Sequence, residues 1–123
     1  MNATTTPRIA LVTGASRGLG RSTALKLAEQ GSDLILTYKG SEAEAHAVVR
    51  QVEALGRRAV ALQLDLADSG SFGAFAERVQ AVLAATWQRE HFDHLVNNAG
   101  IGVAASFAET TEAQFDLLAD IHL

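Results

Sequence analysis

The chain has 123 residues, enough for one domain with a hydrophobic core, and its 48% hydrophobic and 20% charged residues are ordinary for a globular protein. Its net charge of −4 and the lack of a basic cluster argue against nucleic acid or an anionic membrane as a partner. The sequence has no cysteine, which excludes disulfides, thiol catalysis and thiolate metal sites. No apolar run is long enough to cross a bilayer, and the polar start lacks the apolar core of a signal peptide. We therefore expect a cytoplasmic protein with a flexible tail over residues 1–8 and one domain over residues 9–123.

Apolar runs alternate with helical patterns along the chain. Strands are expected at Ile9–Val12, Leu34–Tyr38, Ala59–Leu64 and Phe92–Val96. A first helix is expected at Gly18–Gln30. A second begins at a capping box formed by Ser41 and Glu44 and stops at Gly56. A third runs from about Ser69 to Trp87. A second capping-box spacing, Thr111 and Gln114, predicts a last helix that runs to the end of the chain.

This alternation predicts an α/β fold in which helices cover a doubly wound parallel sheet in three layers. Right-handed crossovers place the strands in the order 3-2-1-4. The strand order then reverses between the first and fourth strands, and ligands of such sheets bind at the carboxyl ends of the strands at that point.

A glycine-rich segment, TGASRGLG at residues 13–20, joins the first strand to the first helix. Strand, glycine turn and helix together are typical of a dinucleotide-binding loop. Gly14 allows a sharp turn, Gly18 lets the backbone approach a pyrophosphate, and Gly20 lets the helix pack closely. The helix start offers N–H groups and a partial positive charge to phosphates. No Lys-Ser/Thr pair follows, so this is not a Walker loop; the alternative is a plain turn without a ligand.

Together with Asn97-Asn98-Ala99-Gly100 downstream, this segment resembles the short-chain dehydrogenase/reductase family, classical type, from Arg8 onward. The asparagines and the glycine also favour an ordinary turn, so the second motif gains its weight from its position after the first. The resemblance implies a Rossmann-type fold. It also implies hydride transfer between a nicotinamide and a small-molecule carbonyl or alcohol substrate, and a homo-oligomer.

The resemblance also implies which residues bind the cofactor. They are Gly14, Ser16, Arg17, Gly18, Leu19, Gly20, Tyr38, Lys39, Asp65, Leu66, Asn97, Ala99 and Gly100. An acidic residue at the end of the second strand would select NAD, but Tyr38 and Lys39 stand there. The charges of Arg17 and Lys39 therefore favour NADP(H), with NAD(H) still possible, unless both are solvated loop charges. Asp65 can alternatively cap the following helix.

The family's catalytic tyrosine, lysine and serine cannot be assigned in this sequence. The single tyrosine is Tyr38, and no Tyr-x-x-x-Lys occurs. His122 stands where the family carries the asparagine of its proton relay, and histidine can also donate, accept and titrate near neutrality. We expect the amino-terminal half of an NADP(H)-dependent carbonyl reductase or alcohol dehydrogenase, inactive by itself. The alternative is a non-catalytic dinucleotide-binding or assembly module.

Two further expectations concern the fourth strand and the histidines. His91 and His94 flank the start of that strand without a third ligand nearby, so no metal site is expected. No fifth strand is predicted in this sequence. The outer edge of the fourth strand should therefore be bare, and the chain should associate through it.

Overall fold

The computed structural model describes residues 7–16, 18–64, 72–96 and 120–122. These residues form an all-parallel sheet in the order β3-β2-β1-β4-β5. The strands are β1 (Ile9–Val12), β2 (Asp33–Tyr38), β3 (Ala59–Gln63), β4 (His94–Val96) and β5 (Asp120–His122). The helices are α1 (Gly18–Glu29), α2 (Glu42–Ala54) and α3 (Phe72–Val82), the last continued by a π-helical segment, Leu83–Trp87. The predicted α/β class and the strand order 3-2-1-4 are confirmed.

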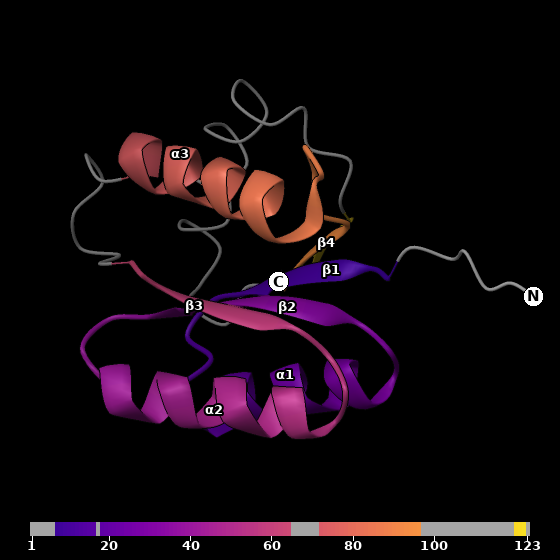
Figure 1. Ribbon diagram of the computed structural model, residues 1–123. Coiled ribbons are helices and arrows are strands. Elements are labelled where there is room, and N and C mark those ends of the chain that lie inside the picture. Colours follow the sequence, from indigo (N-terminus) through magenta and orange to yellow (C-terminus); the bar gives the residue numbers. More distant parts are fainter. Residues whose placement is uncertain (1–6, 17, 65–71, 97–119, 123) are drawn as a thin grey trace, which may run out of the picture.

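The helices cover both faces of the sheet, with α1 and α2 below it and α3 above it in Figure 1. Successive side chains of a strand point to opposite faces, so β1 contributes to two cores. Ile9 and Leu11 pack in the cluster that includes Phe75 of α3, whereas Ala10 and Val12 pack in the cluster formed with α1 and α2. Burial on both faces explains why the inner strands are nearly continuous apolar runs.

Glycines end α1 and α2 close to the predicted positions. Gly31 and Gly56 follow them with φ of 98° and 86°, in the left-handed region that glycine adopts without strain. Ser41 does lie at the amino-terminal cap of α2, but its side chain makes no capping hydrogen bond. The predicted capping box therefore marks the start of the helix correctly but does not form the predicted bond.

The predicted last helix is wrong at its carboxyl end, because Asp120–His122 form strand β5. This strand pairs in parallel with β4, with Leu95 opposite Ile121 and Val96 opposite His122. The open N–H and C=O groups along β4 outweighed the local helical pattern. β4 consequently has an outer neighbour, and the expected bare edge, on which the predicted association depended, is also wrong. Thr111 and Gln114 lie outside the described residues.

The elements around β4 also differ from the predicted bounds. The last turn expected of the third helix is π-helical, and Gln88, whose φ is 53°, follows it as the carboxyl-terminal cap. Strand β4 begins at His94 rather than Phe92. Phe92 is instead fully buried in the core, and Asp93 joins the chain to β1, since its carboxylate accepts from the Ile9 N–H at 2.7 Å.

Candidate functional site

The turn after β1 is held at the carboxyl-terminal edge of the sheet by backbone hydrogen bonds to both neighbouring strands. The Thr13 N–H donates to the Val96 carbonyl of β4 at 3.0 Å, and the Ala15 N–H donates to the Thr37 carbonyl of β2 at 3.0 Å. Gly14 has a φ of 63°, which provides the sharp turn. The glycine turn therefore lies at the predicted reversal of strand order, between β1 and β4.

Thr37 makes a second contact to this turn that the sequence did not indicate. Its hydroxyl accepts from the Gly14 N–H at 3.1 Å, and the residue is buried. One residue of β2 thus satisfies two consecutive N–H groups of the turn. The one sequence signal for Thr37 is that it is a hydroxyl residue near the end of an apolar run. This signal is weak, because many strands carry such a residue without this role.

The start of α1 lies directly against the turn. A Cβ added at Gly20 would lie 2.0 Å from the Gly14 carbonyl oxygen and 3.1 Å from the Ala15 Cα, so no other side chain fits without backbone movement. The expected role of Gly20 in close packing is therefore seen, although its contact is with the turn rather than with a strand. At Gly18, with a φ of 61°, an added Cβ would meet nothing within 4 Å. Open space thus lies beside the first turn of α1.

Two more of the predicted residues are close to Gly18 in the sequence. Leu19 is 75% exposed, and Ser16 is buried. Arg17 lies outside the described residues. The prediction that its charge acts together with that of Lys39 is therefore not tested.

The end of β2 lies at the same edge of the sheet as the glycine turn. Tyr38 is half-buried and Lys39 is exposed. The backbone here is held from β3, because the Leu64 N–H donates to the Tyr38 carbonyl at 2.8 Å and the Gln63 side-chain amide donates to the Lys39 carbonyl at 2.9 Å. Gln63, a second residue that the sequence did not indicate, fixes the backbone from which Lys39 projects.

Several predicted site residues cannot be placed. Asp65, Leu66, Asn97, Ala99 and Gly100 lie outside the described residues. His122 belongs to β5, where its backbone is paired with Val96 at the end of the sheet next to β4. Its predicted role in a proton relay depends on its side chain, about which the structure gives no information, so this role stays a prediction.

The other histidines show no arrangement that would bind a metal. His46 is exposed on α2, and His91 and His94 are half-buried on either side of Phe92 and Asp93. Within the described ranges, no group of three or more histidine, aspartate or glutamate side chains is placed to hold a metal ion. None of the described helices is long and apolar enough to span a membrane.

A parallel sheet whose strand order reverses beside a glycine turn and a helix start defines the class of α/β dinucleotide-binding domains. The family model for short chain dehydrogenases matches residues 8–123, and the chain belongs to that family.

Curated relatives and solved structures agree with this assignment. The chain is 40% identical over 114 residues to the 3-oxoacyl-[acyl-carrier-protein] reductase FabG of Staphylococcus aureus strain Mu50, covering 93% of this chain and 44% of that protein. A short chain dehydrogenase from Burkholderia cenocepacia J2315 in complex with NADP matches with a TM-score of 0.72 and 34% identity, over 88% of this chain and 51% of that one. Acetoin dehydrogenase from Enterobacter cloacae matches with a TM-score of 0.75 and 30% identity, over 91% and 50%. The chain thus spans about half the length of these relatives.

Proposed function

We propose that this chain forms the cofactor-binding part of an NADP(H)-dependent oxidoreductase that transfers hydride between the nicotinamide and a carbonyl or alcohol substrate. The observation that carries this proposal is the glycine turn, in which Gly20 packs on Gly14 while open space remains beside Gly18. A side chain at Gly18 would occupy that space, so these residues suit the close approach of a pyrophosphate. The cofactor, when bound, supplies or accepts the hydride.

The proposal assigns the binding roles as follows. Gly14, Gly18 and Gly20, with Ser16, shape the loop, and the first N–H groups of α1 bind phosphate. Leu19, exposed on the first turn of α1, lies against the bound cofactor. Arg17, Tyr38 and Lys39 surround the adenosine ribose; Asp65 and Leu66 contact the adenine; Asn97, Ala99 and Gly100 line the wall beside the cofactor.

The preference for NADP(H) over NAD(H) rests on charge. Asp33, the acidic residue of β2, lies at the opposite end of that strand from Tyr38 and Lys39, so no carboxylate of β2 is placed to accept from a ribose 2′-hydroxyl. Lys39 is a cation at the end of β2. Two solved relatives are in complex with NADP, which supports NADP(H) as a cofactor of this fold.

The remaining parts of the proposal concern the whole enzyme. The reaction needs a proton donor, and no Tyr-x-x-x-Lys occurs in this sequence, so the chain by itself should be inactive. His122 is proposed to stand in for the relay asparagine. A homo-oligomer and a cytoplasmic location belong to the same proposal. The alternative of a non-catalytic module is not favoured, because relatives such as the Staphylococcus aureus protein are named as reductases.

Replacing Lys39 with alanine should weaken NADPH binding three- to tenfold and leave NADH binding within twofold. The 2′-phosphate loses a charge-assisted contact, whose effect is moderated by the exposure of the side chain. Calorimetric titration of both cofactors measures the ratio. Lys26→Ala is the matched control, since this exposed lysine lies in the last turn of α1. Equal losses for both cofactors, or tighter NADH binding by the unmodified chain, would contradict the preference.

Replacing Thr37 with valine should weaken the binding of NADPH and NADH alike, by three- to tenfold. Valine keeps the shape of the side chain but leaves the Gly14 N–H without its acceptor, so the turn is held less firmly. Thr37→Ser is the control that keeps the hydroxyl, and it should bind within twofold of the original chain. The role of Thr37 is disproved if valine and serine behave alike.

A further inference from the structure

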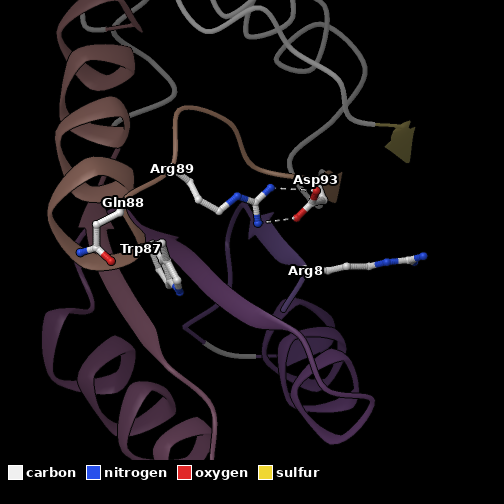
Figure 2. A pocket seen from close by; sticks show the side chains of 5 residues that line it. All are labelled: Arg8, Trp87, Gln88, Arg89 and Asp93. Carbon is white, nitrogen blue, oxygen red and sulfur yellow. Dashed lines mark hydrogen bonds and ion pairs between the residues drawn. The ribbon is translucent and has the colours of Figure 1, made fainter. Parts of the chain in front are cut away.

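Two cavities of the described chain lie away from the glycine turn, at the amino-terminal edge of the sheet. One has a volume of about 500 Å³ and is lined by Arg8, Trp87, Gln88, Arg89 and Asp93, as Figure 2 shows. The second, of about 340 Å³, shares Trp87 and Gln88 with the first. Its other lining residues are Pro7, Asp33, Gly56, Arg57 and Arg58. We refer to the two together as the edge pocket.

The edge pocket is basic, although the whole chain carries a net charge of −4. Its lining holds four arginines and two aspartates. The four arginines come from three separate segments: the residue before β1, the turn before β3 and the loop before β4. Such a concentration of cations in a concave surface attracts anions.

Both aspartate carboxylates already accept hydrogen bonds from donors of the protein. The Asp93 carboxylate accepts two hydrogen bonds from the Arg89 guanidinium, at 3.1 and 3.2 Å, and one from the Ile9 N–H. Partial burial acts to raise the pKa of Asp93, but these hydrogen bonds and the charges of Arg89 and His94 outweigh it and hold the pKa below its usual range. Asp93 therefore stays ionised and its charge balances that of Arg89.

The Asp33 carboxylate also has protein donors. It accepts from the backbone N–H of Arg58 at 2.9 Å and from the Trp87 indole N–H at 2.7 Å, and it forms an ion pair with the Arg57 guanidinium at 3.8 Å. The two aspartates thus balance Arg89 and Arg57, which leaves the charges of Arg8 and Arg58 uncompensated within the pocket lining.

Both of these arginines keep guanidinium donors that no described residue uses. The Arg58 guanidinium donates one hydrogen bond to the Thr86 carbonyl, at 2.6 Å, and keeps further N–H donors. The exposed Arg8 guanidinium makes no hydrogen bond or ion pair with any described residue, and in Figure 2 it extends away from Arg89 and Asp93. Trp87 and Gln88, which line both cavities, add an aromatic ring and an exposed amide.

We propose that the edge pocket binds a small anion with two or more negative charges, such as a phosphate ester or a polycarboxylate, independently of the cofactor. Arg8 and Arg58 contribute the charge, and the wall of Trp87 and Gln88 contributes surface contact. Strands β1 and β2 separate this pocket from the glycine turn, because the two lie at opposite ends of the same strands.

The single tryptophan of the chain makes a direct test simple. Because Trp87 lines both cavities, its fluorescence, excited at 295 nm, reports on the edge pocket and not on the glycine turn. Sodium pyrophosphate and trisodium citrate are the probes, with sodium chloride at matched ionic strength as the blank. We expect a saturable change with at least one probe, and the same dissociation constant within twofold when NADP⁺ is also present.

Two variants locate the binding. Arg8→Gln should weaken the probe five- to tenfold, whereas Arg50→Gln, a matched change of an exposed arginine on α2, should leave it unchanged. Thermal unfolding of both variants should match the original chain, because neither side chain has a partner among the described residues. The proposal is overturned if no probe gives a saturable signal beyond the chloride blank. It is equally overturned if NADP⁺ displaces the probe, or if Arg8→Gln binds as Arg50→Gln does.

Discussion

Replacing Gly20 with alanine is expected to weaken NADPH binding at least 100-fold. The added Cβ would lie 2.0 Å from the Gly14 carbonyl oxygen and 2.8 Å from the Gly14 carbonyl carbon. Both are backbone atoms of the turn that we propose for the pyrophosphate, so α1 and the turn must move apart. The hydrogen bonds from the turn to Val96 and Thr37 resist this movement. The free energy of unfolding should fall by about 1–3 kcal/mol.

Gly73 provides a matched control for this variant. It also lies in a helix, α3, but an added Cβ would meet nothing within 4 Å. Gly73→Ala should therefore keep NADPH binding and raise stability by about 0.5–1 kcal/mol, since alanine favours the helix. Calorimetric titration and urea unfolding of both variants separate a displaced turn from an unfolded chain. Binding by Gly20→Ala within threefold of the original chain would mean that the turn does not hold the cofactor.

The glycine turn shows how far the sequence could predict the site. Gly14, Gly18 and Gly20 could be assigned because each lacks a side chain for a physical reason that the flanking strand and helix make visible. Thr37 could not, because its role depends on the register between β1 and β2, which places its hydroxyl opposite the Gly14 N–H. Contacts between distant residues leave no local pattern in a sequence.

The same distinction holds for the fold. Strand β1 matches its prediction at both ends, because its apolar run is buried on both faces and bounded by polar residues and a glycine. Strand β5 was missed, because Asp120–His122 form a strand only where the edge of β4 offers hydrogen-bond partners. The edge pocket is a further case, since its arginines are scattered along the chain and only the folded sheet brings them together.

Asp33 shows a role that the sequence analysis did not find. Its position at the start of β2 excluded it from the proposed ribose site, and nothing in the pattern suggested another function. In the structure its side chain is only 4% exposed, and it joins three elements: β2, the start of β3 and the π-helical segment that carries Trp87. A carboxylate so deeply buried is stable only with its donors in place.

Replacing Asp33 with alanine should therefore lower the free energy of unfolding by about 3 kcal/mol. The Trp87 indole and the Arg58 N–H would both lose their acceptor in a partly buried site, and each such loss costs about 1–3 kcal/mol. The ion pair with Arg57 adds little, because its atoms are 3.8 Å apart and the arginine is about one-third exposed.

Urea unfolding followed by circular dichroism gives the free energy of unfolding, and the Trp87 emission reports the loss of its hydrogen bond. Asp33→Asn, which keeps one oxygen acceptor, should lose less than Asp33→Ala, and Glu29→Ala, an exposed acidic residue of α1, should lose under 0.5 kcal/mol. If Asp33→Ala were as stable as Glu29→Ala, the hydrogen bonds to Trp87 and Arg58 would not be what holds this edge of the sheet together.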